Sequence, residues 1–176
     1  MFKKSHKIIL FCIFFTLIFS SWLKAEIIDK INIEGNERIS NETIKMFADV
    51  SIGDDLLEND LNQILKKLYN TNFFETVSVK LSGKILIIKV MENPIIQNIS
   101  YEGIKSSQML DELKKKILLK SRSSFNEILL NKDKGQIKSF LKERGYYFSK
   151  VEALIEELED NKINLSYKIN LGEKAK

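Results

Sequence analysis

Two short stretches decide the fold: Ile31-Asn32-Ile33-Glu34-Gly35-Asn36 and, 68 residues further on, Ile99-Ser100-Tyr101-Glu102-Gly103-Ile104. Each alternates apolar and polar residues, which is the period of a strand with one buried face. Each ends in Glu-Gly, where the glycine permits a turn. A polar stretch, two helical patterns and two alternating strands follow both copies. This shared order predicts two β-α-α-β-β repeats and an α+β fold.

The first repeat is predicted from the period of its apolar residues. Leu57, Leu61, Ile64, Leu65 and Leu68 share one face of a helix. The predicted elements are a strand at Ile27–Ile33, a helix capped by Ser40, a helix beginning near Glu58, strands at Thr76–Leu81 and Ile85–Met91, and a turn at Ser82-Gly83.

The second repeat follows the same plan after Pro94, the only proline of the chain. Proline has no N–H and restrains the residue before it, so Pro94 is expected to mark a boundary between residues 26–93 and 94–176. The predicted elements are a strand at Ile96–Tyr101, helices at Met109–Leu119 and Asn126–Arg144, and strands at Phe148–Ile155 and Ile163–Ile169.

Residues 1–25 have the pattern of a secretory signal peptide. Met1–Lys7 is basic, Ile8–Phe19 is apolar except for Thr16, and small Ala25 stands at the expected cleavage position. The apolar run is short for a membrane span, which needs about 20 residues. Because Trp22 prolongs that run, an uncleaved signal anchor is the alternative.

Removal of this segment changes the bulk properties of the chain. The segment holds four of the 28 basic residues and none of the 24 acidic ones, so the remainder is neutral. A neutral chain has no electrostatic basis for nucleic-acid binding. The segment also holds the only histidine, cysteine and tryptophan: His6, Cys12 and Trp22. We therefore expect no enzyme activity, metal, cofactor or small-molecule substrate.

Several motifs add a family resemblance to this interpretation. Gly53-Asp54, Asp60-Leu61, Ile64-Leu65, Leu68-Tyr69 and Asn72-Phe73-Phe74-Glu75 resemble the first POTRA (polypeptide-transport-associated) repeat of BamA-type outer-membrane assembly factors. The similarity continues through Glu92-Asn93-Pro94-Ile95-Ile96, Tyr101-Glu102-Gly103, Gly145-Tyr146-Tyr147 and Leu171-Gly172-Glu173. It covers residues 26–176. It implies that each repeat is a three-stranded mixed sheet with two helices on one face.

The resemblance also implies a binding function at the sheet edges. In POTRA domains the second strand is the usual edge, and an unpaired edge can accept an extended segment of a partner. The edge residues so indicated are Thr76, Val77, Ser78, Val79, Lys80, Leu81, Ser149, Lys150, Val151, Glu152, Ala153, Leu154 and Ile155. The partners implied are periplasmic chaperones, outer-membrane lipoproteins and unfolded outer-membrane precursors, met at the periplasmic face of the outer membrane.

A second candidate surface follows from alternation along the strand after the first hairpin. If Leu86, Ile88 and Val90 pack on the helices, then Ile85 and Ile87 face away from them. These two isoleucines either form an apolar groove on the uncovered sheet face or are covered by neighbouring side chains.

In the family, further POTRA repeats and a membrane β-barrel follow such repeats, whereas this sequence ends at Lys176. We expect a piece of a longer protein, with membrane contact only through a barrel outside this sequence. A stand-alone periplasmic scaffold is the alternative. Transporters of the TamA or two-partner-secretion type and division proteins of the FtsQ type also carry POTRA domains, and they remain rival identities.

Overall fold

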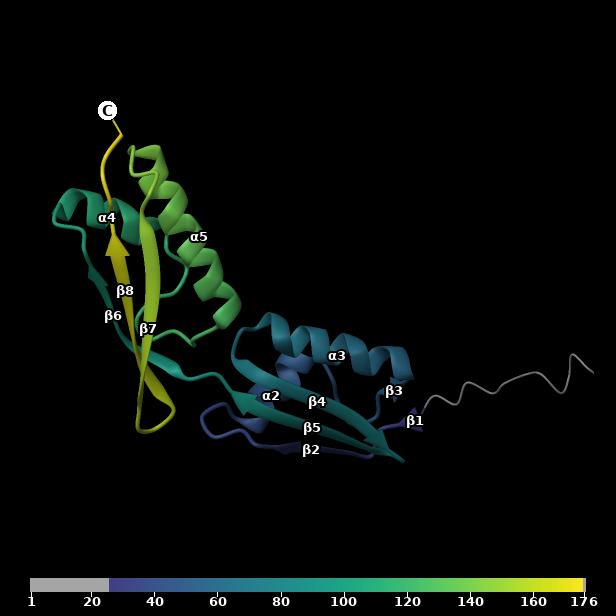
Figure 1. Ribbon diagram of the computed structural model, residues 1–176. Helices are drawn as coiled ribbons and strands as arrows, with labels where there is room; N and C mark the ends of the chain where they lie inside the picture. Colours follow the sequence, from purple (N-terminus) through teal and green to yellow (C-terminus); the bar gives the residue numbers. More distant parts are fainter. Residues whose placement is uncertain (1–25, 176) are drawn as a thin grey trace, which may run out of the picture.

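The computed structural model describes residues 26–175 as two units, each with one three-stranded sheet and two helices (Figure 1). The first unit contains β1 (Glu26–Ile27), β2 (Lys30–Glu34), α2 (Asn41–Ala48), β3 (Asp55–Leu56), α3 (Glu58–Asn70), β4 (Phe74–Ser82) and β5 (Ile85–Glu92). The second contains β6 (Ile95–Glu102), α4 (Ser107–Lys116), α5 (Glu127–Glu143), β7 (Lys150–Leu158) and β8 (Lys162–Asn170). The predicted export signal, residues 1–25, lies outside the described residues.

Both sheets have the same topology. The strand order is β2-β5-β4 in the first and β6-β8-β7 in the second. In each sheet the first strand is parallel to the central one and the hairpin partner is antiparallel. The predicted α+β fold with two mixed three-stranded sheets is therefore confirmed.

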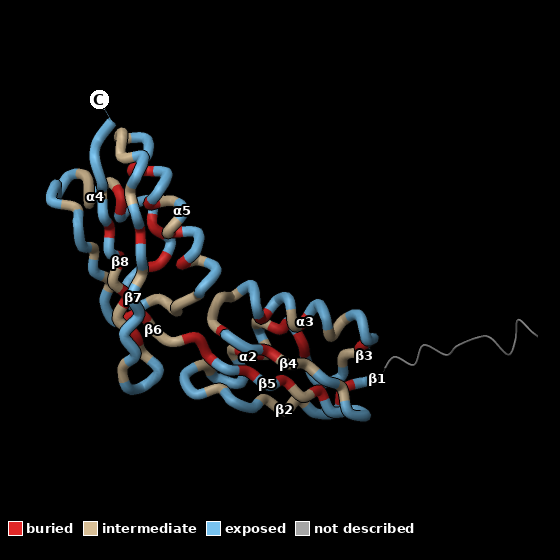
Figure 2. Tube along the Cα trace, in the orientation of Figure 1, coloured by how far each residue is buried: buried red, intermediate tan, exposed pale blue. Residues whose placement is uncertain are grey.

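Each core lies between one face of a sheet and its two helices, as the buried segments in Figure 2 show. In the first unit, Ile44 of α2, Leu68 of α3 and Leu86 of β5 have no exposed surface. In the second, Tyr167 of β8 and Leu141 of α5 are equally buried. Alternate residues of the central strands supply these cores, as the period of two predicts.

Polar caps set the helix starts. Ser40 Oγ accepts from Thr43 N at 3.2 Å, and Asn126 Oδ1 accepts from Leu129 N at 3.0 Å. These contacts satisfy donors that a helix start leaves without a helical partner. The predicted helix beginnings at Ser40, Glu58 and Asn126 agree with the structure.

The predicted strand Ile27–Ile33 is wrong as one element, because the chain breaks into β1 and β2 there. Ile28 lies between them, where its N–H donates to Asp54 O at 2.9 Å and its carbonyl accepts from Gly53 N at 2.8 Å. β1 consequently pairs with β3 in a separate two-stranded sheet. Ile28 is buried and Ile27 is exposed, which reverses the expected orientation.

A buried carboxylate ends the first helix of the second unit earlier than predicted, at Lys116. Asp133 of α5 accepts from Leu118 N at 2.7 Å and from Leu119 N at 2.9 Å, so the chain leaves the helix after Ile117. Asp133 Oδ2 also accepts from the Tyr167 hydroxyl at 3.1 Å. Burial, then the Asp133 charge and this hydrogen bond, raise the pKa of Tyr167.

The two predicted hairpins are present, with shifted boundaries. The first turn lies at Gly83-Lys84, one residue later than predicted, because β4 continues through Ser82. The strand predicted at Phe148–Ile155 instead begins at Lys150 and ends at Leu158.

Candidate docking surface

The structure places both predicted docking strands at sheet edges. β4 contains Thr76–Leu81, and β7 contains Lys150–Ile155. Ser149 precedes β7 by one residue and is not part of the strand. β2 and β6 form the opposite edges. An unpaired edge is the geometry that strand addition requires, but partner binding at these residues stays a prediction.

The β4 edge has one apolar and one polar side. Val77 is buried on the helix side, where Val79 and Leu81 are partly buried. Their partners on β5 are the buried residues Val90, Ile88 and Leu86. The polar side chains on the uncovered face are Thr76, Ser78 and Lys80.

The β7 edge loses its helix cover toward the end of the strand. Val151 is buried and Ala153 partly buried, but Ile155 is 44% exposed although it pairs with buried Leu165 on the same face. Leu154 lies on the opposite face and is also exposed. The β7 edge therefore presents more apolar surface than its sequence alternation alone predicts.

A cleft of about 580 Å³ lies between the two units. Its lining includes Tyr69 and Glu75 of the first unit and Phe125, Ile128, Ile155 and Leu158 of the second. The cleft joins the start of β4 to the end of β7. Sequence reasoning missed it because it depends on how the two units are placed.

One backbone N–H of the β4 edge is already hydrogen-bonded to a side chain of α3. The Val77 N–H donates to the Tyr69 hydroxyl, with 3.1 Å between nitrogen and oxygen. This N–H is therefore directed away from β5 and toward α3. The sequence marks Tyr69 only as part of the family motif.

Ile85 and Ile87 lie on the uncovered face of the first sheet. Ile85 is 36% exposed and Ile87 is partly buried, while Leu86 and Ile88 are buried. In register, Lys30 and Ser82 flank Ile85, and Asn32 and Lys80 flank Ile87. The two isoleucines thus lie between polar neighbours, and a docking role for them stays a prediction.

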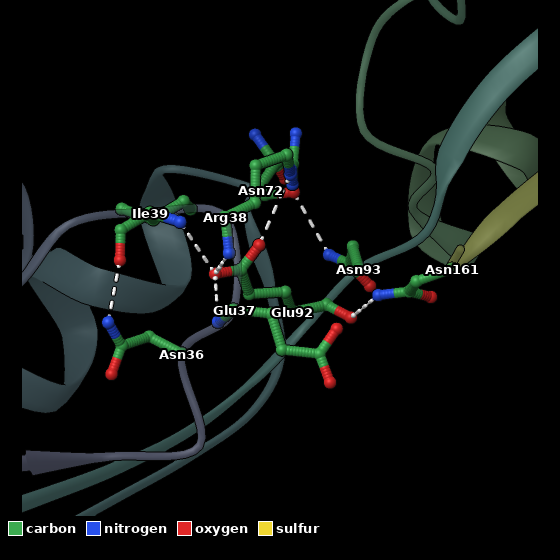
Figure 3. A network of polar contacts seen from close by, with 8 residues as sticks. All are labelled: Asn36, Glu37, Arg38, Ile39, Asn72, Glu92, Asn93 and Asn161. Atoms are coloured by element: carbon green, nitrogen blue, oxygen red, sulfur yellow. Dashed lines mark hydrogen bonds and ion pairs between the residues drawn. The ribbon is translucent and has the colours of Figure 1, made fainter.

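A buried carboxylate, Glu92 at the end of β5, organises the loop between β2 and α2 (Figure 3). Its Oε1 accepts from the backbone N–H groups of Glu37, Arg38 and Ile39 at 3.0, 3.0 and 2.8 Å. Its Oε2 pairs with Arg38 Nε at 3.2 Å. Burial alone would raise the pKa of Glu92, but these three donors and the Arg38 charge outweigh burial and lower it.

The connection between the units is held from both sides. Asn93 N donates to Phe73 O at 2.8 Å, and Asn93 Nδ2 donates to Asn72 O at 2.9 Å. From the second unit, Asn161 Nδ2 donates to the Glu92 carbonyl at 3.1 Å (Figure 3). These contacts restrain the residues that connect β5 to β6.

Metal-binding clusters and membrane-spanning helices are two features that the described residues lack. Between residues 26 and 175 no group of three histidine, cysteine, aspartate or glutamate side chains is placed to hold a metal ion. Within the same range, no helix has both the length and the apolar character needed to cross a membrane.

Comparison with known families agrees with this topology. The family model described as POTRA, surface antigen variable number repeat, matches residues 26–93 and 94–172. The chain belongs to the POTRA family. The resemblance to POTRA repeats found in the sequence is thereby confirmed.

Relatives of this POTRA chain are named outer membrane protein assembly factor BamA. That of Buchnera aphidicola is 30% identical over 172 residues, which cover 94% of this chain and 28% of the relative. That of Neorickettsia risticii is 32% identical over 116 residues, which cover 66% of this chain and 14% of the relative. That of Neisseria meningitidis is 28% identical over 152 residues, which cover 85% of this chain and 19% of the relative. The chain spans less than a third of these curated relatives.

Solved POTRA structures share the fold at low identity. The N-terminal domain of Omp85 from Thermosynechococcus elongatus has a TM-score of 0.54 at 16% identity, covering 80% of this chain and 61% of that one. POTRA1-2 of the periplasmic domain of Omp85 from Anabaena has a TM-score of 0.52 at 12% identity, covering 85% and 97%. Identities this low support the fold alone.

Proposed function

We propose that this chain is the periplasmic docking part of a BamA-type outer-membrane assembly factor, and that it binds proteins rather than catalysing a reaction. Its partners are periplasmic chaperones, accessory lipoproteins and unfolded outer-membrane precursors. They dock by adding an extended segment to the edge of β4 or β7. Export to the periplasm by residues 1–25 belongs to the same proposal.

The observation that carries this proposal is the pair of nine-residue edge strands, β4 and β7. Strand addition uses backbone N–H and C=O groups, so it depends little on the partner's side chains. That property suits a protein that meets many unfolded sequences. The opposite edges suit the proposal less well. β2 and β6 run parallel to the central strands β5 and β8, and β2 has only five residues.

Charges on the two edges favour partner binding over self-association. Lys80 of β4 and Lys150 of β7 are exposed, and lysine on an edge strand opposes pairing between identical edges. Glu152, Glu156 and Glu157 make β7 the more acidic strand. Partner segments that bear lysine or arginine should therefore prefer β7 at low salt.

Site-specific photocrosslinking in cells tests the proposal. A photoreactive residue at Lys80 or Glu152 should crosslink to periplasmic polypeptides. The same residue at Lys89, on the same uncovered face but on the central strand β5, should crosslink much less.

A backbone variant separates strand addition from side-chain contact. Val79→Pro removes one edge N–H, whereas Val79→Ala truncates the side chain and keeps the N–H. We expect Val79→Pro to lose crosslinking at Lys80 and Val79→Ala to retain it, with native circular dichroism in both. Unchanged crosslinking in a folded Val79→Pro protein would show that β4 does not dock partners by strand addition.

A further inference from the structure

The hydrogen bond from Val77 N to the Tyr69 hydroxyl reveals which backbone groups of β4 face outward. Neighbouring residues of an antiparallel strand direct their N–H and C=O groups to opposite sides. Because the Val77 N–H is directed to α3, the N–H groups of Val79 and Leu81 also point away from β5. Those of Ser78 and Lys80 point toward β5.

An added strand has to pair with this outward-facing set. Val79 and Leu81 lie at the free edge, toward the hairpin end of β4. At Val77 the donor is already bound to a hydroxyl, so an incoming carbonyl must displace Tyr69 to reach it. Tyr69 therefore competes with a partner for one backbone position of the edge.

The second unit lacks this contact. Val151 of β7 occupies the place of Val77, since Val77 pairs with Val90 as Val151 pairs with Ile169. The helix residue that corresponds to Tyr69 is Lys142, because Leu68 and Leu141 occupy matching buried positions near the helix ends. Among residues 26–175, no side chain accepts a hydrogen bond from Val151 N.

We propose that Tyr69 determines where a strand can add to the first unit. It closes the Val77 position and restricts the added strand to the outward groups of Val79 and Leu81. On β7 an added strand can pair from Val151 onward. The two edges thus differ in the length of partner segment that they accept, and Tyr69 acts as a positioning residue. This inference rests on the proposed function of β4 as a docking edge.

Amide exchange of the purified chain, read by NMR, tests the role of Tyr69. The probe is a capped heptapeptide of alternating threonine and valine flanked by glutamate, because the acidic strand β7 would attract a basic peptide. Tyr69→Phe removes the hydroxyl and keeps the ring, so the fold should be preserved. Without peptide, it should speed exchange at Val77. Saturating peptide should slow exchange at Val79 and Leu81 in the unaltered protein, and it should slow exchange at Val77 as well in Tyr69→Phe.

The variant should also bind the peptide between about twofold and tenfold more tightly, the effect of one added hydrogen bond. Tyr147→Phe, at a tyrosine that is 57% exposed, is the matched control. It should change neither the amide exchange of Val77 nor the affinity for the peptide. If the peptide slowed exchange at Val79 and Leu81 in both proteins but not at Val77 in Tyr69→Phe, only the role of Tyr69 would be overturned. If the peptide slowed exchange at none of the outward amides of Val77, Val79 and Leu81 in either protein, both the docking edge and the inference would be wrong.

Discussion

The Glu92 carbonyl accepts a hydrogen bond from Asn161 Nδ2 at 3.1 Å, so the last residue of the first sheet is tied to the hairpin turn of the second unit. Within the second unit, the Asn161 carbonyl accepts from Ile95 N at 2.9 Å, at the start of β6. Its φ of 51° lies in the left-handed region, which asparagine and glycine tolerate better than other residues. This one residue therefore restrains the angle between the units.

Asn161→Gly should loosen that angle without unfolding either unit. Glycine retains the positive φ and the carbonyl, so only the bond to Glu92 is lost, at a cost of about 1 kcal/mol. Spin labels on Lys66→Cys and Lys115→Cys, in a Cys12→Ser background, should give a broader distance distribution. The matched control is Asp160→Gly in the same turn, which has φ 59° and leaves Asn161 intact. An unchanged distribution in Asn161→Gly would contradict the restraint.

Glu92→Gln should make the first unit less stable at neutral pH and less sensitive to acid. The folded-state pKa of Glu92 lies below the ordinary 4.5, so its stabilisation is present above that value. The stabilisation is lost as the pH falls through the folded-state pKa. The glutamine variant lacks this charge at every pH, and we expect a loss of about 1.5–3 kcal/mol at pH 7. Urea unfolding between pH 7 and pH 3 measures both effects.

Glu34→Gln is the control for Glu92→Gln. Glu34 pairs with Lys89 at 2.8 Å, but both side chains are more than half exposed, so this ion pair should contribute less than about 1 kcal/mol. If the two variants lost equal stability at pH 7, the three backbone donors around Glu92 would not be the source of its effect.

Asp133→Asn should destabilise the second unit and leave the first unchanged. Leu118 N and Leu119 N bond to different oxygens of Asp133, and in asparagine one of these oxygens is replaced by an NH2 group that cannot accept, so one buried N–H faces a donor. The expected loss is about 2–4 kcal/mol, with shifts in the amide signals of β6–β8 and not of β2–β5. Asp111→Asn, at an exposed residue of α4, should cost less than about 1 kcal/mol. A similar loss in both variants would contradict the role of the buried Asp133 contacts.

Most of the fold is predictable from the sequence, because the spacing of apolar residues along the chain identifies most helices and strands. The alternation of Ile163, Leu165, Tyr167 and Ile169 alone identifies β8, and all four side chains are buried. The break at Ile28 was not predictable from local sequence, because its partners Gly53 and Asp54 are distant in the chain. The early end of α4 has the same cause, a long-range contact with Asp133.

The candidate site was only partly predictable. The resemblance identified β4 and β7, but not the Tyr69 hydroxyl on Val77 N or the cleft between the units. Outside the docking edges, the sequence did contain a signal for the buried residue Asp133. It lies on the apolar face of α5, four residues before buried Ile137. A charged residue at such a position indicates a buried polar network.

The glycines of the repeated Glu-Gly motif should be intolerant of any side chain. Gly103 has φ 96°, and a Cβ there would lie 1.7 Å from the Ile169 carbonyl oxygen of the central strand. At Gly35 the corresponding distance, to the Val90 carbonyl oxygen, is 2.1 Å. The positive φ alone costs an alanine about 1–2 kcal/mol, and displacement of β8 adds to it. We therefore expect Gly103→Ala to lose more than about 2 kcal/mol in urea unfolding.

Gly135→Ala is the matched control for this motif, and it should have the opposite sign. Gly135 lies within α5, and a Cβ there meets no atom within 4 Å apart from its chain neighbours and the backbone of its own helix. Alanine favours the helix over glycine by about 1 kcal/mol, so the second unit should unfold at a higher urea concentration. If Gly103→Ala were as stable as the unaltered chain, the close approach of the motif to β8 would not explain why glycine follows glutamate in both repeats.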